Sequence, residues 1–579
     1  MLPLLSIQDL GISFETADGL SPGVEAISFD VRRGEIVALV GESGSGKSIT
    51  ALSILRLLPS PPARYMSGEL LFTGRDGRTI DLLRQEEEAL LRIRGAEIGM
   101  IFQEPMTSLN PVFTCGEQVA EAIRAHQSLS AAEVRRMTVA LFERVQLPDP
   151  EGMYTRWPHQ LSGGQKQRVM IAMAMSSQPL LLICDEPTTA LDVTVQKTIL
   201  ELIRQLQTTN DMGVIFITHD LGVVAEVADR ALVLYKGKVV EAGPVEELFR
   251  NPKHPYTRGL LYSRPALHEK GERLPESDER PRQRGAAGPM GGKPWGLGAA
   301  KPMGTAPAGT AETTSGGVLV RAEDLRVWYP ARKTLLGKVL EWRKAVDGVS
   351  FNVYAGETLG LVGESGCGKT TLGRALLRLV EPTDGRVFFE GVDLATLGAR
   401  ELKRLRSRMQ LIFQDPYSSL NPRLSAGEAI SEAMKVHGLG GSERQRREAV
   451  VDLLEKVSLK AEHYGRKPHE FSGGQRQRIV IARALTLKPA FIVADESVSA
   501  LDVSVQAQVL NLLNDLKAAF GFTIVFISHD LSVIRYMSDR ILVMNRGRIE
   551  ESGEAAELYK NPRSKYTKDL IAAIPRLKA

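Results

Sequence analysis

A long internal repeat constrains this chain of 579 residues more than any other feature. Five segments of the first half reappear in the same order in the second half, about 310–320 residues further on. The clearest pairs are VALVGESGSGKSIT (37–50) with GLVGESGCGKTTL (360–372), and LSGGQKQRVMIAMA (161–174) with FSGGQRQRIVIARA (471–484). Solenoid repeats have periods of roughly 20–50 residues, so this much longer period predicts a duplicated domain.

The repeat predicts three parts. We expect a first copy at residues 1–270, a linker at 271–317 and a second copy at 318–579. The linker holds 11 glycines and 6 prolines in 47 positions, so it has little apolar surface to bury and should be flexible. One aromatic residue in it, Trp295, hints at a docking contact, although a lone aromatic in a linker is usually incidental.

Composition narrows the class of protein. With 43% hydrophobic and 25% charged residues, the chain is an ordinary globular protein and not a disordered one. A net charge of +4 is too small to indicate a dedicated nucleic-acid binder, and three cysteines cannot form a disulfide framework. No stretch approaches the roughly 18 consecutive apolar residues of a membrane span, so we expect no transmembrane helix and no pore formed by this chain alone.

Within each copy, short apolar segments alternate with helical patterns. Examples are EIVALV, LLLICD and GVIFITHD in the first copy. Apolar runs without polar alternation are typical of strands covered on both faces, so the pattern predicts an α/β fold with a parallel sheet. Residues 115–160 and 425–470 are rich in Ala, Glu and Arg and are predicted to be helical inserts.

Both copies contain a glycine-rich phosphate loop, GESGSGKS at 41–48 and GESGCGKT at 363–370. Each matches GxxxxGK[ST], follows an apolar strand and opens a helix, which is the context that gives this motif its meaning. Backbone N–H groups of such a loop surround phosphate oxygens at a helix N-terminus. We expect Lys47 and Lys369 to reach the nucleotide phosphates and Ser48 and Thr370 to bind Mg²⁺.

An acidic pair ends a second apolar strand in each copy, Asp185-Glu186 and Asp495-Glu496. The aspartate is placed to hold Mg²⁺, directly or through water, and the glutamate to polarise an attacking water. Acidic pairs at strand ends are usually solvated turns, but their pairing with a phosphate loop favours the catalytic interpretation.

Further motifs in both copies give the chain a family resemblance. With the phosphate loops and acidic pairs, Gln103 and Gln414, the SGGQ tetrapeptides, the ALD segments and the THD and SHD segments resemble the ATP-binding cassette family. The resemblance covers both copies and omits only the linker. It implies an α/β fold of tandem P-loop NTPase nucleotide-binding domains, each with a RecA-like core, a helical subdomain and an antiparallel β edge.

The resemblance also implies roles for particular residues. Glu186, Glu496, His219 and His529 would be catalytic, and Mg²⁺ would be held by Ser48, Gln103, Asp185, Thr370, Gln414 and Asp495. The residues implied to bind ATP are Phe14, Gly41, Ser43, Gly44, Gly46, Lys47, Ser48, Gln103, Ser162, Gly163, Gly164, Gln165, Asp192, Tyr329, Gly363, Ser365, Gly366, Gly368, Lys369, Thr370, Gln414, Ser472, Gly473, Gly474, Gln475 and Asp502.

Two of these implied roles concern the arrangement of the site. Phe14 and Tyr329 match the aromatic that stacks on adenine, with Trp328 as a rival to Tyr329. In this family the SGGQ motif of one copy closes over the nucleotide held by the other copy's phosphate loop. The signature at 472–475 would therefore complete the site of Lys47, and the signature at 162–165 that of Lys369. We expect both sites to hydrolyse ATP.

Finer similarities point to one group of the family. The segments FQEPMTSLNP (102–111) and FQDPYSSLNP (413–422), and the tails NPKHPYTRGLLYSRPAL (251–267) and NPRSKYTKDLIAAIPRL (561–577), resemble the dipeptide, oligopeptide and glutathione importer ATPases. This implies docking on two transmembrane permease subunits at the cytoplasmic face of the membrane, with an extracytoplasmic solute-binding protein and no nucleic-acid partner. The alternative is a tandem ATPase that acts on ribosomes, but such proteins usually carry a long charged helical linker, which this chain lacks.

The three cysteines Cys115, Cys184 and Cys367 are scattered, which argues against a metal–sulfur site. Cys367 lies inside the second phosphate loop, where the helix N-terminus and Lys369 are expected to lower the pKa of its thiol. A plain substitution for Ser45 of the first loop is the simpler interpretation.

Overall fold

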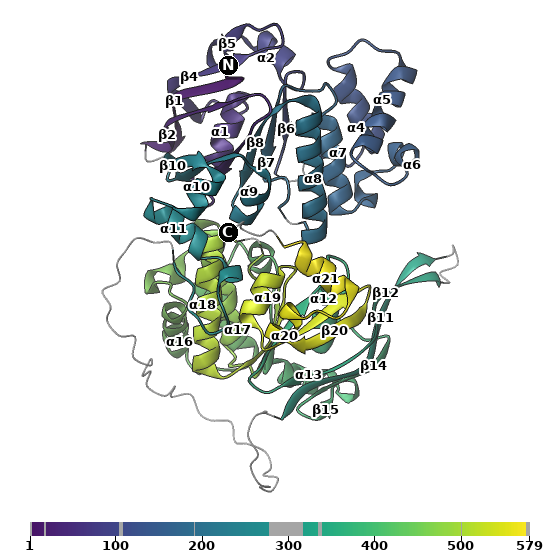
Figure 1. The fold of residues 1–579 in the computed structure, drawn as a ribbon. Coiled ribbons are helices and arrows are strands. Elements are labelled where there is room, and N and C mark those ends of the chain that lie inside the picture. The colour runs from purple at the N-terminus through teal and green to yellow at the C-terminus, as the bar shows by residue number, and fades with distance from the viewer. Residues whose placement is uncertain are drawn as a thin grey trace.

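The computed structural model describes residues 3–16, 19–103, 108–189, 191–276, 317–333, 339–499 and 501–574. Figure 1 shows two similar bodies, the first copy in purple to teal above the second copy in green to yellow. Each copy is an α/β domain with one mostly parallel sheet and one antiparallel sheet. The predicted duplicated α/β fold is therefore confirmed. Trp295 lies outside the described residues.

The central sheet of the first copy has six strands. In spatial order they are β10 (Lys238–Pro244), β9 (Arg230–Tyr235), β3 (Ile36–Val40), β8 (Gly213–Thr218), β7 (Leu181–Asp185) and β6 (Ile98–Ile101). Only the β9–β10 pair is antiparallel. All residues of β3, β7 and β8 are buried, which explains their unbroken apolar sequences.

The second copy repeats this sheet in the same spatial order, read from its other edge. Its strands are β16 (Met409–Ile412), β17 (Phe491–Asp495), β18 (Thr523–Ile527), β13 (Thr358–Val362), β19 (Arg540–Asn545) and β20 (Arg548–Glu554). In both copies the phosphate-loop strand, β3 or β13, lies inside the sheet, so its carboxyl end faces the neighbouring strand ends that carry the other motifs.

A four-stranded antiparallel sheet forms the predicted β edge of each copy. Its strands are β2 (Gly19–Val31), β1 (Leu5–Thr16), β4 (Ala63–Thr73) and β5 (Thr79–Asp81) in the first copy, and β12 (Val339–Tyr354), β11 (Val318–Lys333), β14 (Asp384–Phe389) and β15 (Val392–Asp393) in the second. The β11–β12 hairpin extends outward beyond the rest of the second copy in Figure 1.

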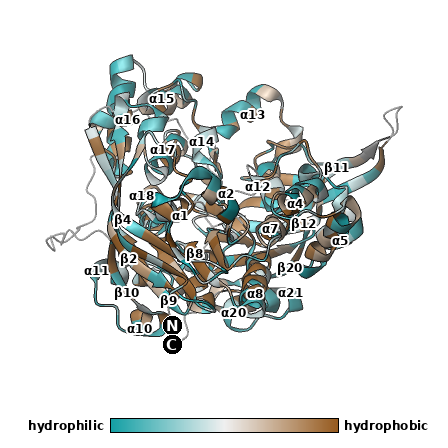
Figure 2. Ribbon diagram, turned by 90° about the horizontal axis from the view of Figure 1, so that it is seen from above, coloured by the Kyte–Doolittle hydropathy of each residue, from teal (hydrophilic) through white to brown (hydrophobic). Residues whose placement is uncertain are grey.

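Helices cover the central sheets. In the first copy they are α1 (Lys47–Ile54), α2 (Glu87–Ile93), α4 (Cys115–Arg124), α5 (Ala131–Arg144), α6 (Pro150–Tyr154), α7 (Gly163–Ala174), α8 (Val193–Asn210), α9 (Leu221–Val227), α10 (Val245–Arg250) and α11 (Pro255–Tyr262). In the second they are α12 (Lys369–Leu376), α13 (Ala399–Arg406), α14 (Pro416–Ser419), α15 (Ala426–Val436), α16 (Glu443–Lys456), α17 (Gly473–Leu485), α18 (Val503–Phe520), α19 (Leu531–Met537), α20 (Ala555–Lys560) and α21 (Lys565–Ala572). In Figure 2 the enclosed strand β8 is brown while outer helices such as α5 and α16 are largely teal, as expected for a buried sheet with a solvated exterior.

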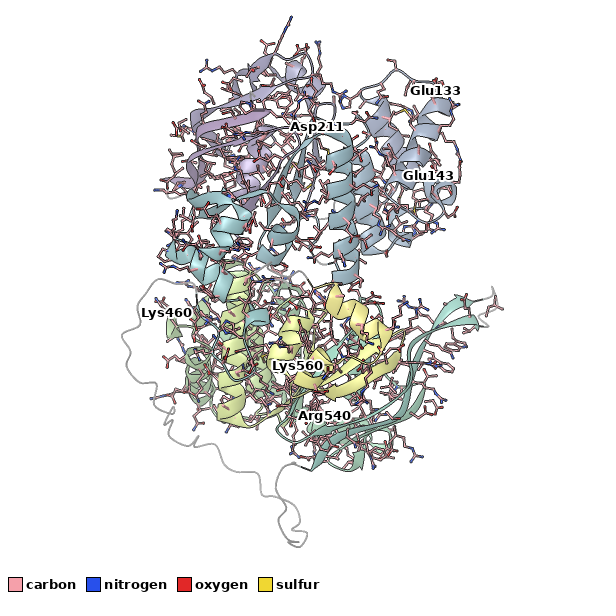
Figure 3. All side chains as sticks on the ribbon, in the orientation of Figure 1. Glu133, Glu143, Asp211, Lys460, Arg540 and Lys560 are labelled. Atoms are coloured by element: carbon pink, nitrogen blue, oxygen red, sulfur yellow. The ribbon has the colours of Figure 1, made fainter. Side chains whose placement is uncertain are left out.

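The predicted helical inserts are present as α4 to α6 and as α15 and α16. Local sequence fixes where their helices begin: Thr114, Ser130 and Ser425 each cap a helix in a reciprocal box with the glutamate three residues later. Figure 3 shows Glu133, the partner of Ser130, and Glu143 on α5 at the outer edge of the first copy.

The start of the expected linker packs on the second copy. We call residues 268–276 the strap. Leu274 is 1% exposed and belongs to the core of the second copy. The side chain of Asn511 accepts a hydrogen bond from the N–H of Leu274 (3.0 Å) and donates one to its carbonyl (2.9 Å). The Tyr536 hydroxyl donates to the Glu272 carbonyl at 2.7 Å. The first six residues of the predicted flexible segment, 271–276, are thus an ordered part of the interface between the copies.

Among the described residues, no helix is both long enough and apolar enough to cross a lipid bilayer.

Candidate nucleotide sites

Each phosphate loop joins a buried strand to a helix, β3 to α1 and β13 to α12. Gly46 and Gly368 precede these helices with φ of 102° and 113°, a conformation that favours glycine. A Cβ atom on Gly46 would lie 2.6 Å from a Val24 methyl carbon, so the space as well as the conformation requires glycine. The loop therefore presents backbone N–H groups at a helix N-terminus, as an anion site requires.

The loop lysines are buried at the centre of each site. Lys47 and Lys369 are 5% and 4% exposed, and each Nζ donates to the carbonyl of the first loop glycine at 2.7 Å. Burial lowers the pKa of Lys47 from its usual value, although Glu186 and other nearby carboxylates oppose the shift. Four nearby carboxylates act to raise the pKa of Lys47, so the surroundings of this lysine are acidic.

Two of the three residues predicted to hold Mg²⁺ in each copy are in contact, whereas the third, Gln103 or Gln414, contacts the neighbouring glutamate. The Ser48 hydroxyl donates to Asp185 Oδ1, and the Thr370 hydroxyl to Asp495 Oδ1, both at 3.0 Å. Burial raises the pKa of Asp185 to about 6 and that of Asp495 above its usual range, against the opposing effect of these hydrogen bonds. A buried carboxylate beside a hydroxyl is a hard oxygen donor set of the kind that Mg²⁺ prefers when nucleotide phosphates and water supply the remaining ligands.

No group of three or more His, Cys, Asp or Glu residues capable of binding a metal ion occurs in the described part of the chain. The Ser48–Asp185 and Thr370–Asp495 pairs fit an Mg²⁺ ion whose remaining ligands come from a nucleotide and water.

The predicted catalytic residues converge beside each loop. Gln103 Nε2 donates to Glu186 Oε2 at 3.1 Å, and His219 Nδ1 lies 3.4 Å from Glu186 Oε1. Burial alone would raise the pKa of Glu186, but the hydrogen bond and charge of His219, with Thr189 and Lys47, lower it to about 2. The carboxylate is thus held ionised, as a group that accepts a proton from water must be.

The second copy reproduces this arrangement. Gln414 Nε2 donates to Glu496 Oε2 at 2.8 Å, and His529 Nδ1 lies 3.5 Å from Glu496 Oε1. Glu186 and Glu496 also share a left-handed backbone conformation, with φ of 47° and 44°, which is strained for a residue other than glycine. Both copies therefore present the carboxylate from the same backbone turn.

The two copies touch each other at the phosphate loops. Asp192 and Asp502 precede α8 and α18 but make no side-chain cap on those helices. The Asp192 carboxylate accepts instead from the N–H of Ser365 at 2.5 Å, and the Asp502 carboxylate from the Ser43 hydroxyl at 3.2 Å. Each aspartate therefore contacts the phosphate loop of the opposite copy. The phosphate loop of each copy thus faces the start of α8 or α18 in the other copy.

The signature motifs begin α7 and α17. Ser162 and Ser472 cap these helices, each in a reciprocal box with Gln165 or Gln475. Ser162, Gly163, Ser472 and Gly473 are exposed, whereas Gly164 is half-buried and Gly474 buried. No hydrogen bond joins either signature serine to the opposite phosphate loop in the described residues, so the expected closure over a nucleotide remains a prediction.

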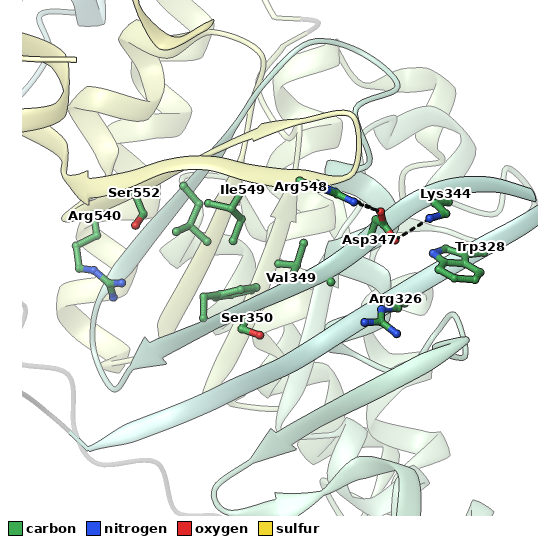
Figure 4. Close-up of a pocket in the computed structure, with 13 residues that line it drawn as sticks. Arg326, Trp328, Lys344, Asp347, Val349, Ser350, Arg540, Arg548, Ile549 and Ser552 are labelled. Atoms are coloured by element: carbon green, nitrogen blue, oxygen red, sulfur yellow. Dashed lines mark hydrogen bonds and ion pairs between the residues drawn. The ribbon is translucent and has the colours of Figure 1, made fainter. Parts of the chain in front are cut away.

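The second site includes a cavity of about 830 Å³ above its phosphate loop. Tyr329 lines this cavity together with Gln414, Glu496 and loop residues. Trp328 and Lys344 line a different pocket, shown in Figure 4. The Lys344 ammonium lies 4.7 Å from the centroid of the Trp328 ring. The position of Tyr329 favours it over Trp328 as the aromatic for adenine. In the first copy Phe14 occupies the equivalent strand position and lies against Gly23.

Arg343 is a residue of the second site that sequence reasoning missed. It is the cross-strand partner of Tyr329 and lines the same cavity, with its guanidinium 3.7 Å from where a Cβ of Gly366 would lie. The residue paired with Phe14 in the first copy is Ser21. Only comparison of the two registers reveals this difference, because the hairpins differ in length.

Sequence reasoning also missed two tyrosines that form hydrogen bonds with the backbone of the phosphate loops. The hydroxyl of Tyr256 accepts a hydrogen bond from the N–H of Glu42, and that of Tyr566 from the N–H of Glu364, both at 3.1 Å. These tyrosines come from the repeated tails that resemble those of the peptide importer ATPases. The signal was present as a tyrosine repeated in HPYT and SKYT, but nothing local relates it to a loop more than 200 residues away.

Of the two interpretations of Cys367, the lowered thiol pKa is wrong, and the plain substitution for Ser45 agrees with the structure. The side chain is 6% exposed, and burial raises the pKa of its thiol despite the opposing effect of Lys369. Ser45, its counterpart, is 4% exposed, so a small buried residue suffices at this position. Cys184 is likewise fully buried in β7.

Two family models match both copies. The ABC transporter family model matches residues 24–189 and 346–499. The model for the C-terminal region of oligopeptide/dipeptide transporters matches residues 240–294 and 551–579.

Relatives match over the full chain. The peptidoglycan transport ATP-binding protein YejF of Agrobacterium fabrum is 48% identical, covering 100% of this chain and 97% of the relative. The glutathione import ATP-binding proteins GsiA of Salmonella typhimurium and Escherichia coli are each 48% identical, covering 99% of this chain and 89% of the relative. The chain therefore belongs to the ABC transporter family, as a tandem ABC ATPase in which each copy ends in the C-terminal region of oligopeptide and dipeptide transporters.

Proposed function

We propose that this chain is the ATP-hydrolysing subunit of a membrane importer for peptides or glutathione-like solutes. The observation that carries the proposal is the contact of glutamine, glutamate and histidine beside each buried loop lysine, present in both copies. Relatives that match over the full length and are named for glutathione import and peptidoglycan transport support the class of cargo.

The residues suggest how hydrolysis proceeds. Lys47 and Lys369 would bind the phosphates, and Ser48 with Asp185, or Thr370 with Asp495, would hold Mg²⁺, which neutralises phosphate charge when bound. Glu186 and Glu496 would accept a proton from the attacking water. His219 and His529 orient these carboxylates and stabilise their charge.

Two sites shared between copies provide a route from hydrolysis to movement. Each nucleotide would lie between the loop of one copy and the signature of the other, so ATP favours a closed arrangement and its hydrolysis an open one. A ligand shifts such an equilibrium by its differential affinity for the two states. The contacts of Asp192 and Asp502 with the opposite loops support this crosswise arrangement.

The partners proposed are two transmembrane permease subunits and an extracytoplasmic solute-binding protein, with the chain bound peripherally at the cytoplasmic face of the membrane. Co-purification of the tagged chain from detergent-solubilised membranes tests this. We expect two permeases in the complex and ATP hydrolysis stimulated by a peptide-loaded binding protein. Recovery with ribosomes and without permeases would contradict the proposal.

A further inference from the structure

A glutamate in each phosphate loop contacts both the C-terminal region of its own copy and a helix of the opposite copy. Glu42 and Glu364 occupy the second position of their loops, between the first glycine and the lysine. The backbone of each is held by its own copy, and its side chain is held by the opposite copy. No sequence motif assigns either residue a role.

The backbone contact comes from the C-terminal region of the same copy. Tyr256 lies in α11, is 2% exposed and stacks on Tyr235 with ring centroids 4.2 Å apart. Its hydroxyl accepts the N–H of Glu42. Tyr256 is buried and packed. If its hydroxyl were removed, water would have little access to the Glu42 N–H, and the lost hydrogen bond would not be replaced.

The side-chain contact comes from the other copy. The Ser504 hydroxyl, at the start of α18, donates to Glu42 Oε1. The Thr194 hydroxyl, at the start of α8, donates to Glu364 Oε1 at 2.7 Å. A carboxylate at the N-terminus of a helix interacts favourably with the helix dipole, and α8 and α18 each have 18 residues.

The same arrangement occurs twice with different residues. The tyrosine follows His-Pro in the first copy and Ser-Lys in the second, and the hydroxyl across the interface is a serine in one case and a threonine in the other. The tyrosine, the loop glutamate and the opposite hydroxyl keep their contacts through these changes. Two versions of one contact chain argue against chance packing.

We propose that the C-terminal region of each copy sets the nucleotide affinity of its own phosphate loop through Tyr256 or Tyr566, and that Glu42 and Glu364 link that loop to the opposite copy. The tyrosines are positioning residues: they hold the loop N–H groups in the geometry that phosphate needs. This inference rests on the proposed nucleotide binding at each loop.

The test isolates one site at a time in the full chain. Lys369→Ala leaves only the first site able to bind tightly, and Lys47→Ala only the second. In the Lys369→Ala background, Tyr256→Phe should weaken ADP binding about five-fold, the effect of one lost hydrogen bond to a partly buried N–H. In the Lys47→Ala background, Tyr256→Phe should leave ADP binding unchanged, and Tyr566→Phe should weaken it. Calorimetric titration measures each dissociation constant.

Tyr262→Phe is the matched control, because this tyrosine lies in the same helix and is 52% exposed. It should change neither affinity nor melting temperature. Equal affinities for the Tyr256→Phe variant and its parent would overturn the inference while leaving the proposed function intact. Absence of ADP binding in every background with intact tyrosines would instead refute the proposed function.

The link between copies is tested by Ser504→Ala, a change in the second copy. It should weaken ADP binding at the first site, in the Lys369→Ala background, and leave the second site unchanged. A purely structural tyrosine would act independently of Ser504. We expect the Tyr256→Phe/Ser504→Ala double variant to lose less affinity than the product of the two single effects, because both contacts hold one glutamate. A multiplicative result would refute the link.

Discussion

The two candidate catalytic glutamates have matching surroundings and should contribute alike. We predict that Glu186→Gln and Glu496→Gln each reduce ATP turnover by at least half, and that the double variant reduces it about 100-fold or more, since a general base contributes roughly 10²–10⁴-fold. Phosphate release from the purified chain measures this. Glu201→Gln, on the exposed side of α8, is the control. Full activity in either single variant would show that the two sites are not equivalent.

Arg343 makes the second site different from the first. No carboxylate pairs with it in the described part of the chain, so its charge is available to a bound polyphosphate. We predict that Arg343→Ser, the residue found at position 21 of the first copy, weakens ATP binding at the second site about ten-fold, since a charged hydrogen bond contributes roughly 1.5–3 kcal/mol when partly buried.

The matched control is Lys344→Ser, which removes the same charge from the opposite face of the hairpin, where Lys344 pairs with Asp347 (Figure 4). AMP binding should be nearly insensitive to Arg343→Ser, because AMP lacks the outer phosphates. If Lys344→Ser weakened ATP binding as much as Arg343→Ser, general attraction by the hairpin would be the explanation. Fluorescent nucleotide titration in the Lys47→Ala background distinguishes the two.

At the scale of elements, most of the fold was predictable from local sequence. Unbroken apolar runs gave β3, β7 and β8, and the glycine pattern gave the turn into α1, because neighbours in sequence determine these features. The choice between Tyr329 and Trp328 was not predictable in this way. It depends on register shifts within the β11–β12 hairpin, which decide the face each residue occupies.

Contacts between distant elements had no local signal. Leu274 is a single apolar residue in the polar run GERLPES, with no periodicity to mark it. Its side chain packs in the core of the second copy, and Asn511, in α18, satisfies both of its backbone groups. The composition of residues 271–317 therefore predicted a linker. The packing of the strap on the second copy determines where that linker begins.

Leu274 should hold the strap against the second copy. Leu274→Ala removes a fully buried side chain and should cost the strap about 2–3 kcal/mol of docking energy. Trypsin should then cleave after Arg273 at least ten-fold faster, because cleavage requires the strap to leave its site. Leu267→Ala, at a residue 49% exposed in the preceding segment, should leave the rate unchanged. Equal cleavage rates for the two variants would show that Leu274 does not hold the strap.

At the scale of the whole molecule, the strap and the phosphate-loop contacts should hold the copies together without nucleotide. Both side chains of the Arg273–Asp515 ion pair are about half exposed, and such pairs contribute roughly 0–1 kcal/mol to stability. Leu274 should therefore contribute most to holding the strap on the second copy. A specific protease site inserted between residues 276 and 317 allows the chain to be cut after folding. We expect the two halves to co-elute in size-exclusion chromatography after cleavage, to separate on dilution when Leu274 is alanine, and to stay together when Asp515 is asparagine. Separation of the unsubstituted halves at micromolar concentration would mean that the covalent connection, and not the strap, keeps the two sites assembled between turnovers.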